Sequence, residues 1–379
     1  MDKTMNITLN RLPARTWNRL KMNEAVVQNV KVPVAKGIQE KEEKNAGNYF
    51  SDGLKVHPAN EEEKRFFANI ETALGKDLDK LGEAFPIEVV ECADEENGKE
   101  ENKEKIIEKN EEKDRENNHL LVLPLTPDGQ FGRYFLHVKK DSQMNVAVYC
   151  TSKETEVDSL FLQLKVYAEA NARIDITVVQ TADKNVSVFS DIGGILEKNA
   201  AVNLVKMELG GKKVYSGVYM DLKGDFSSFE ARIGYLGEEK QHLDMNYVAR
   251  HHGRKTQSLM ESSGVLDEDA FKLFRGTIDF VKGCSESVGN EKEDVLLFGE
   301  NVVNQTIPLI LCAEEDVEGN HGASIGELDE KTLFYLMSRG FTAEKAKKMI
   351  AKARLEAVAA QIKEDSVREK TRKYLEERL

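Results

Sequence analysis

The chain has 379 residues, of which 40% are hydrophobic and 32% charged, and its formal net charge is −13 at pH 7. This length can bury a large core in more than one structural unit. The negative balance and the lack of a basic stripe argue against nucleic acid as a partner. No apolar run approaches the roughly 20 residues that a membrane helix needs, and the first residues lack the apolar core of a secretory signal. We therefore expect a cytoplasmic protein with no membrane contact.

Four cysteines are scattered along the chain without a CxxC pair: Cys92, Cys150, Cys284 and Cys312. This spacing fits a reducing compartment and argues against a self-contained zinc or cluster cage. If a metal is involved, its ligands must converge from distant parts of the chain or from a partner.

The N-terminal part, residues 1–92, predicts a mixed and helical region. Its clearest pattern is helical and covers residues 60–85, where apolar residues recur on one face after three glutamates. Residues 93–118 are saturated with charge and nearly free of aromatic residues, so they cannot bury enough apolar surface to offset the cost of ordering. We expect a flexible linker or insertion there, with a solvated single helix as the alternative.

Residues 119–326 contain a series of short strand candidates, with polar and apolar residues alternating and no long helix between them. This order excludes a doubly wound α/β sheet. A turn phrase at residues 170–176 resembles that at 198–204, and a degenerate copy begins at Gly224. Such a repeat predicts a solenoid of stacked strands, although a β-sandwich stays open from the spacing alone.

The last part of this region carries the densest chemistry. Residues 306–311 are a short apolar run that contains Pro308, which predicts a buried strand rather than a helix. A loop is expected over residues 314–323, where His321 would lie among carboxylates that hold it protonated or orient it as a ligand. Such a loop could bind a metal, transfer protons or simply turn a corner. Cys312 either faces the same cavity as His321 or is a buried thiol, the commoner state of a free cysteine.

Residues 327–379 predict helices. Asp329 can cap the first, Thr342 precedes the second, and Ser366 with Glu369 forms a capping box that announces a third. No nucleotide-binding GxxxxGK[ST] loop, GxSxG or HExxH motif is present, so a conventional hydrolase has no support from motifs.

Two phrases resemble a known family. DVEGNHGAS, residues 316–324, is similar to the histidine loop of the SufB/SufD family, and LFYLMSRG, residues 333–340, is similar to its helical signature. These proteins are scaffold subunits of the SUF iron–sulfur cluster assembly machine. The resemblance implies a mainly β fold with a right-handed parallel β-helix core over residues 119–326. An N-terminal helical region and a C-terminal helical domain, residues 327–379, would flank that core.

The resemblance also implies a non-enzymatic scaffold of the SufD type. His321 would offer a ligand to iron or to a transient iron–sulfur cluster, at an interface with a SufB-type sister or with a second copy of the chain. Glu293 stands where the sister SufB carries a cysteine, so this chain is not expected to assemble a cluster alone. Cys312, Glu315 and Asp316 are further candidate ligands, and solvated loop acids are the plainer interpretation of the last two.

The C-terminal helices are expected to bind a SufC-type ABC ATPase, and ATP would be bound only by that partner. The residues that carry this expectation are Leu333, Phe334, Tyr335 and Arg339. The resemblance also raises a reduced flavin as a cofactor of the complex, and the chain shows no flavin motif. Two alternatives remain open: a β-helix enzyme that acts on acidic polysaccharide, and a homodimeric interaction module. The enzyme has against it the lack of a secretion signal and of a basic groove.

Overall fold

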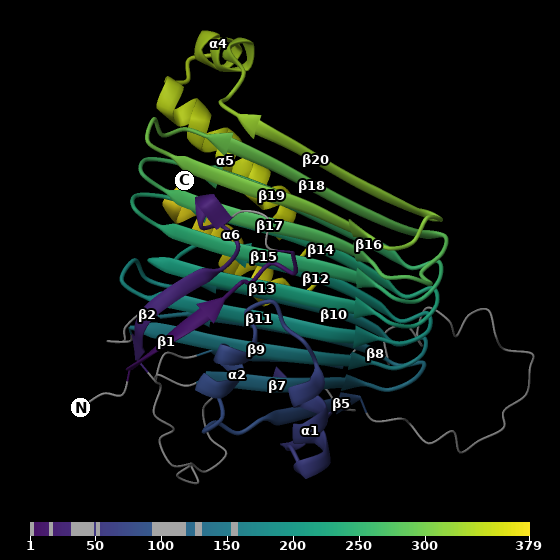
Figure 1. Ribbon diagram of the computed structural model, residues 1–379. Helices are drawn as coiled ribbons and strands as arrows, with labels where there is room; N and C mark the ends of the chain where they lie inside the picture. The colour runs from purple at the N-terminus through teal and green to yellow at the C-terminus, as the bar shows by residue number, and fades with distance from the viewer. Residues whose placement is uncertain are drawn as a thin grey trace, which may run out of the picture.

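The computed structural model describes residues 4–14, 18–31, 49–50, 54–92, 119–125, 131–152 and 158–379. The predicted charged segment 93–118 lies outside the described residues. Figure 1 shows a stack of parallel strands flanked by helices, with α5 and α6 at the C-terminal end of the chain. The predicted fold class, a mainly β protein with a parallel β-solenoid and a C-terminal helical region, is confirmed.

The solenoid has two facing sheets, and successive strands from β6 onward alternate between them, so that each turn adds one strand to each sheet. Within the described residues, the first sheet, which we call the helix-covered sheet, contains β3 (Tyr49–Phe50), β6 (His119–Leu125), β8 (Gln143–Thr151), β10 (Arg173–Thr181), β12 (Ala201–Glu208), β14 (Ser228–Gly237), β16 (Gln257–Leu266), β18 (Ser287–Leu297) and β20 (Val317–Gly326). The second, the hairpin-covered sheet, contains β4 (Leu54–Pro58), β5 (Glu88–Cys92), β7 (Phe131–Val138), β9 (Ser159–Ala168), β11 (Ser187–Leu196), β13 (Lys213–Leu222), β15 (His242–His251), β17 (Phe271–Phe280) and β19 (Val303–Cys312).

The turns explain the repeat seen in the sequence. Asp141, Asn171, Asn199 and Phe226 occupy equivalent corners, and each has a positive φ, between 57° and 63°. The side-chain amide of Asn199 donates to Asn171, and that of Asn171 donates to Asp141, so the corner side chains form a ladder along the stack. Asparagine and aspartate tolerate this left-handed conformation better than most residues. The weak repeat at residues 170–176 and 198–204 is therefore the corner of the solenoid.

The side chains of each strand alternate between the interior of the solenoid and an outer face. In β10, Ile174, Ile176 and Val178 belong to the interior core, while Val179 belongs to a separate cluster on the outer face. Residues two apart in a strand lie on the same face. The strands are buried on both faces because helices or a hairpin cover the outside.

Helices α5 (Ala343–Ala359) and α6 (Asp365–Arg378) cover the outer face of the helix-covered sheet. Their buried apolar residues pack against the outward-facing apolar residues of that sheet, among them Val179, Val205, Met207 and Leu236. Thr342 caps α5 as predicted, but the capping box at Ser366 is wrong. Glu364 accepts the backbone N–H of Val367 at 2.5 Å, so the helix begins earlier.

The hairpin of β1 (Thr4–Leu9) and β2 (Ala25–Lys31) packs over the other sheet, together with α2 (Lys76–Leu81). The short 3₁₀ helix η1 (Asn18–Leu20) lies between the two strands in the chain, and α1 (Glu61–Asn69) precedes α2. The helical unit predicted for residues 60–85 is present as two short helices, α1 and α2, with a break between them. The backbone N–H of Leu74 donates to Asp191 at 3.1 Å, and Gly75 has φ +86°, so the chain leaves the helix between α1 and α2.

A buried ion pair holds the N-terminal segment against the sheet. Arg275 of β17 is fully buried, and its Nη1 lies 2.5 Å from Oδ1 of Asp244 in β15. The Nε of Arg275 donates to the carbonyl of Met22, and Asn10 donates to Asp244. The contact of Arg275 with Met22 and that of Asn10 with Asp244 each join residues more than 200 positions apart. No helix in the described part of the chain is long and apolar enough to cross a membrane.

Candidate site at the open end of the solenoid

The last two strands, β19 and β20, each pair with only one neighbour among the described strands: β19 with β17 and β20 with β18. We call this region the open end. Of the predicted buried strand at residues 306–311, the strand is confirmed but the burial is wrong: Ile307 is buried, whereas Pro308 is exposed. Proline is tolerated here because an edge strand has backbone positions that need no ladder partner. The residues are exposed because no further turn covers them.

His321 lies in the middle of β20 and not in a loop, so that prediction is wrong. The strand pairs with β18 in an unbroken parallel register over ten residues, and His321 is aligned with Glu291. Residues aligned in parallel strands share a face. Because Glu291 and Glu293 are buried on the interior face of β18, the exposed imidazole of His321 belongs to the same interior face, at the mouth of the solenoid.

Glu291 is the first carboxylate below His321. It is 5% exposed, and burial together with the charge of Glu293 raises its pKa to about 7, although Lys272 opposes the shift. Gly276 of β17 makes room for it, since a Cβ there would lie 2.8 Å from the carboxyl carbon of Glu291. Neighbouring strands are about 4.8 Å apart. Glu291 is therefore the neighbour of His321 on the interior face, one strand below it.

Glu293 is engaged within the interior. Its carboxylate accepts from the Tyr235 hydroxyl at 2.9 Å, from Nζ of Lys272 at 2.6 Å and from the Thr306 hydroxyl at 2.6 Å. Burial lowers the pKa of Lys272 and raises that of Tyr235, while the Glu293 carboxylate favours the protonated form of both. The hydrogen bonds from Tyr235 and Thr306 help to offset the cost of burying the Glu293–Lys272 ion pair. Both carboxylate oxygens of Glu293, which is expected from the resemblance to stand at the position of the SufB cysteine, are thus engaged in these contacts.

Cys312 is exposed, and its thiol lies 2.9 Å from the carbonyl oxygen of Glu314. The expectation of a buried thiol is wrong, because β19 is the last strand of its sheet. Cys312 does share the interior face with His321, since it is aligned with the buried Phe280. The two side chains therefore face the same mouth from opposite sheets.

Glu315 and Asp316 are exposed in the turn before β20. Asp316 lies five residues from His321, about 16 Å along an extended strand. The expectation that the loop acids surround the imidazole is therefore wrong. Among the described residues, the predicted ligands do not bring three donor atoms within 4.8 Å of one another. The open end by itself offers an incomplete ligand set.

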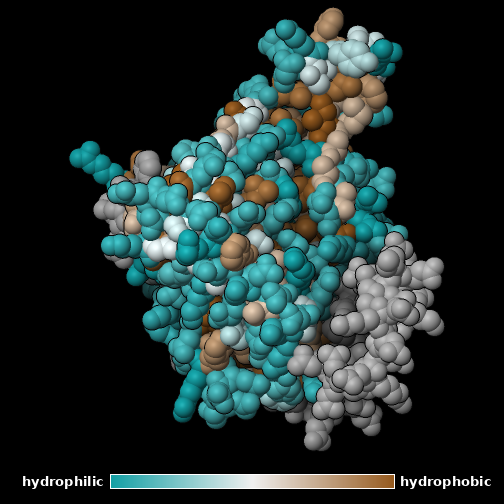
Figure 2. Space-filling view, turned by 90° about the vertical axis from the view of Figure 1, so that its right-hand side faces the viewer, coloured by the Kyte–Doolittle hydropathy of each residue, from teal (hydrophilic) through white to brown (hydrophobic). Residues whose placement is uncertain are grey.

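Helix α4 (Glu330–Ser338) projects from this end, as Figure 1 shows. Asp329 accepts the backbone N–H of Thr332, which confirms the predicted cap. None of the residues of α4 is buried: Phe334 is 74% and Tyr335 is 55% exposed. Figure 2 shows apolar side chains gathered near this upper end of the molecule. The guanidinium of Arg339 lies 5.2 Å from the centre of the Tyr335 ring, so these two predicted partner residues lie side by side on the exposed surface.

Sequence reasoning missed Glu291, Lys272 and Gly276. A signal was present in β18, where Gly289, Glu291, Glu293 and Val295 alternate with the outward positions. Two glutamates at interior positions of a solenoid strand indicate a polar mouth, but the strand's orientation had to be known first.

A family model described as "SUF system FeS cluster assembly, SufBD core domain" matches residues 123–354, more than half of the chain. An iron–sulfur cluster assembly SufBD family protein of Mycobacterium leprae is 27% identical over 237 residues, which cover 62% of this chain and 27% of the relative. SufD of Bacillus subtilis is 28% identical over 130 residues, covering 34% and 30% of the two chains. SufB of the same organism is 24% identical over 223 residues, covering 59% and 48%.

The chain thus spans less than half of the length of these relatives. It is similar to both SufB and SufD, so similarity alone does not separate the two types. The resemblance noted in the histidine and helical phrases is confirmed at the level of the family. The chain belongs to the SufBD family of the SUF iron–sulfur cluster assembly system.

Proposed function

We propose that this chain is a scaffold subunit for iron–sulfur cluster assembly and works through the open end of its solenoid. The observation that carries the proposal is the exposure of His321 on the interior face of an edge strand, which pairs only with β18 among the described strands and lies directly above the buried Glu291. An imidazole and a carboxylate are suitable ligands for iron, and the set is incomplete without donors from a second chain.

The second chain is a SufB-type sister or another copy of this chain. The outer edges of β19 and β20 carry backbone groups that no described strand pairs, and such edges favour the addition of another sheet. We favour the SufD type because Glu293 occupies the position of the SufB cysteine and is held by Lys272, Tyr235 and Thr306. Thiolates would then come from the sister chain.

The nascent cluster, or its iron, is the cargo of this interface. His321 binds iron through an imidazole nitrogen, and Glu291 below it orients the ring or accepts its proton. A ligand set divided between two chains keeps the cluster labile enough to be passed on. Cys312 lies on the same interior face and is a weaker candidate for a ligand, since its thiol is engaged with the carbonyl oxygen of Glu314.

The apolar surface of α4 binds a SufC-type ABC ATPase, which binds the ATP of the complex. Phe334 and Tyr335 are exposed and join no core within the described part of the chain. Exposed aromatic residues beside an arginine are typical of residues that contribute most to protein–protein affinity. On this proposal the chain itself catalyses no reaction and acts in the cytoplasm.

Copurification from cells that express the chain with the SufB-type and SufC-type proteins of the same source tests the proposal. Phe334→Ala should abolish copurification of the ATPase, whereas Met349→Ala, at an exposed apolar residue of α5, should not. Point variants are preferable to removal of residues 327–379, because that would also uncover the sheet beneath α5 and α6. Equal recovery of the ATPase with the Phe334→Ala variant would contradict the assignment of α4.

A further inference from the structure

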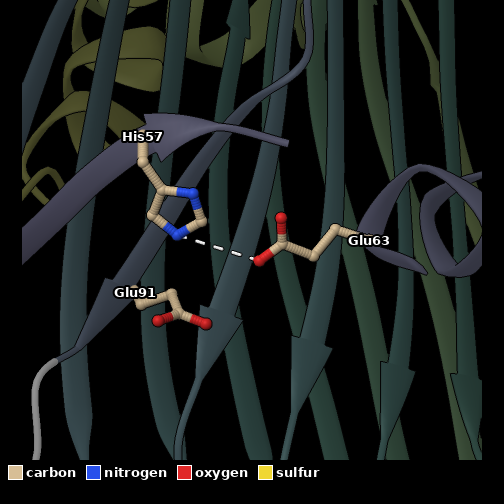
Figure 3. A group of neighbouring side chains, drawn as sticks. All are labelled: His57, Glu63 and Glu91. Atoms are coloured by element: carbon tan, nitrogen blue, oxygen red, sulfur yellow. Dashed lines mark ion pairs between the residues drawn. The ribbon is translucent and has the colours of Figure 1, made fainter. Parts of the chain in front are cut away.

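Three potential ligand residues meet at the opposite end of the solenoid from His321. His57 lies on β4, Glu63 in the first turn of α1 and Glu91 on β5. One donor atom from each lies within 4.8 Å of the other two, and within the described residues this is the one such group of three. Figure 3 shows the imidazole edge of His57 directed toward the two carboxylates. Three separate elements thus converge on one point.

The hydrogen bonding of His57 turns a lone pair toward that point. Its Nδ1 lies 3.1 Å from the carbonyl oxygen of Pro58, which can only accept, so Nδ1 is the donor in this contact. In the neutral ring, Nε2 then carries a lone pair and faces Oε1 of Glu63 at 3.8 Å. An acceptor nitrogen and two carboxylates cannot hydrogen-bond to one another. They need a cation between them, or a second proton on the ring.

Both glutamates are held in place by contacts that leave an oxygen available. Oε2 of Glu63 accepts the backbone N–H of Asn60 in a capping box, which leaves Oε1 toward His57. Oε1 of Glu91 contacts Nδ1 of His137 at 3.1 Å and Nζ of Lys139 at 3.3 Å, which leaves Oε2. Burial alone would raise the pKa of Glu91, but Lys139 and His137 outweigh it and lower the pKa, which favours a charged ligand.

A second set of side chains, around His137, holds the candidate ligand Glu91 in place. Nε2 of His137 lies 2.7 Å from Oε1 of Glu169, so His137 is fixed between Glu91 and Glu169. Its ring also stacks on that of Phe135, with centroids 5.9 Å apart. Metal ligands are commonly oriented by such outer hydrogen bonds. The side chains of His57, Glu63 and Glu91 are partly buried, so a cation could enter without opening the core.

We propose that His57, Glu63 and Glu91 bind a divalent transition-metal cation that fastens the N-terminal end of the solenoid. One imidazole and two carboxylates match Zn²⁺ or Fe²⁺, which would keep open positions for water. Ligand atoms of a tetrahedral zinc site are about 3.4 Å apart. The three donor atoms lie within 4.8 Å of one another, so they need to close by up to about 1.4 Å. The cation would tie β4 and α1 to β5 and is independent of the cargo at His321.

Calorimetry with Zn²⁺ and the EDTA-treated full chain tests this site. The His321→Ala variant serves as the parent, so that binding at the open end does not contribute. We expect one equivalent of Zn²⁺ to bind, with affinity reduced at least tenfold by His57→Ala, by Glu91→Gln and by Glu63→Gln. Glu63→Gln preserves the capping box, because glutamine can also accept from Asn60, so its effect cannot come from a lost helix cap.

His252→Ala is the matched control. His252 is also partly exposed, and its Nδ1 lies 2.5 Å from Oδ1 of Asp221, but it is not part of a three-donor group. We expect this variant to bind Zn²⁺ like the parent. Zn²⁺ should also raise the midpoint of thermal unfolding of the parent and of the His252→Ala variant, but not of the His57→Ala variant.

Two results would overturn the proposal. One is the absence of Zn²⁺ binding at concentrations up to 1 mM by a folded parent chain, which would leave only an imidazolium–carboxylate cluster. The other is unchanged affinity in both the His57→Ala and Glu91→Gln variants. Neither result bears on the open end, because the parent already lacks His321.

Discussion

The two ends of the solenoid differ in how their last strands are covered. At the N-terminal end the chain reverses direction: β4 runs antiparallel to β5, and α1 packs over it with Phe67 in a buried cluster. At the C-terminal end, β19 and β20 are full-length parallel strands with exposed side chains. A solenoid is stabilised by the turns on either side of each strand. On the proposed function, a second chain completes the exposed end. The difference can be tested by mutating matched positions at the open end and in the buried strands β15 and β17, which we call the wall.

The largest loss of stability is expected in the wall. Asp244→Ala leaves Arg275 as a buried and unpaired charge, which should lower the free energy of unfolding by about 3–5 kcal/mol. Asp316→Ala, at an exposed turn of the open end, should change it by less than about 0.5 kcal/mol. Urea unfolding of both variants measures the contrast. Similar losses would mean that the open end is as tightly integrated as the wall.

The stability of the chain should depend on pH through Glu291, which lies between Gly276 in the wall and His321 at the open end. Its pKa of about 7 in the folded chain lies above the ordinary glutamate value of 4.5, so its contribution to stability is fully present below about pH 4.5 and is lost as the pH rises toward 7. Glu291→Gln removes this loss. The variant should equal the parent at pH 4 and be more stable by about 2–3 kcal/mol at pH 8.5. A constant difference at all pH values would contradict the assignment.

A smaller effect is expected at Gly276, where the wall meets Glu291. Gly276→Ala places a Cβ against the carboxyl group of Glu291, which must move aside. We expect a loss of about 1 kcal/mol, and a smaller loss when the substitution is combined with Glu291→Ala. A thermal-unfolding cycle of the two single variants and the double variant measures this coupling. Strict additivity would indicate that Gly276 is needed for another reason.

The smallest effect on stability is expected in α4. Phe334→Ala should change the free energy of unfolding by less than about 0.5 kcal/mol, because Phe334 is 74% exposed. Chemical denaturation of the isolated chain measures this value. A loss above about 1 kcal/mol would show that Phe334 is packed in the isolated chain and would weaken its role as a partner-binding residue.

The corners and strands of the solenoid leave local signals, but these left a β-sandwich open, and the resemblance to the SufB/SufD family decided for the solenoid. Asn171 and Asn199 mark the corners, and the strands alternate in polarity. The caps at Asp329 and Thr342 were equally local. The break between α1 and α2 was not predicted because it depends on a long-range contact. The backbone N–H of Leu74 donates to Asp191, a residue more than a hundred positions away. Such a contact leaves no trace in the helical pattern itself.

The site was only partly predictable for the same reason. The phrase around His321 marked the important residue, but its placement in a strand depends on pairing with β18. The exposure of Cys312 depends on being in the last strand, and the neighbours of Glu291 come from two strands. The three ligands proposed near the N-terminus have no motif, because His57 and Glu91 are brought together by the antiparallel pairing of β4 with β5.

The central claim is that His321 at the open end binds the cargo of the scaffold. The most direct test is the iron and acid-labile sulfide content of the complex purified with its SufB-type and SufC-type partners. We compare the parent chain with His321→Ala and with His252→Ala, a histidine away from the open end. The claim predicts that His321→Ala forms the same complex but carries several-fold less iron and sulfide, while His252→Ala matches the parent. Full cluster content in an intact His321→Ala complex would contradict it.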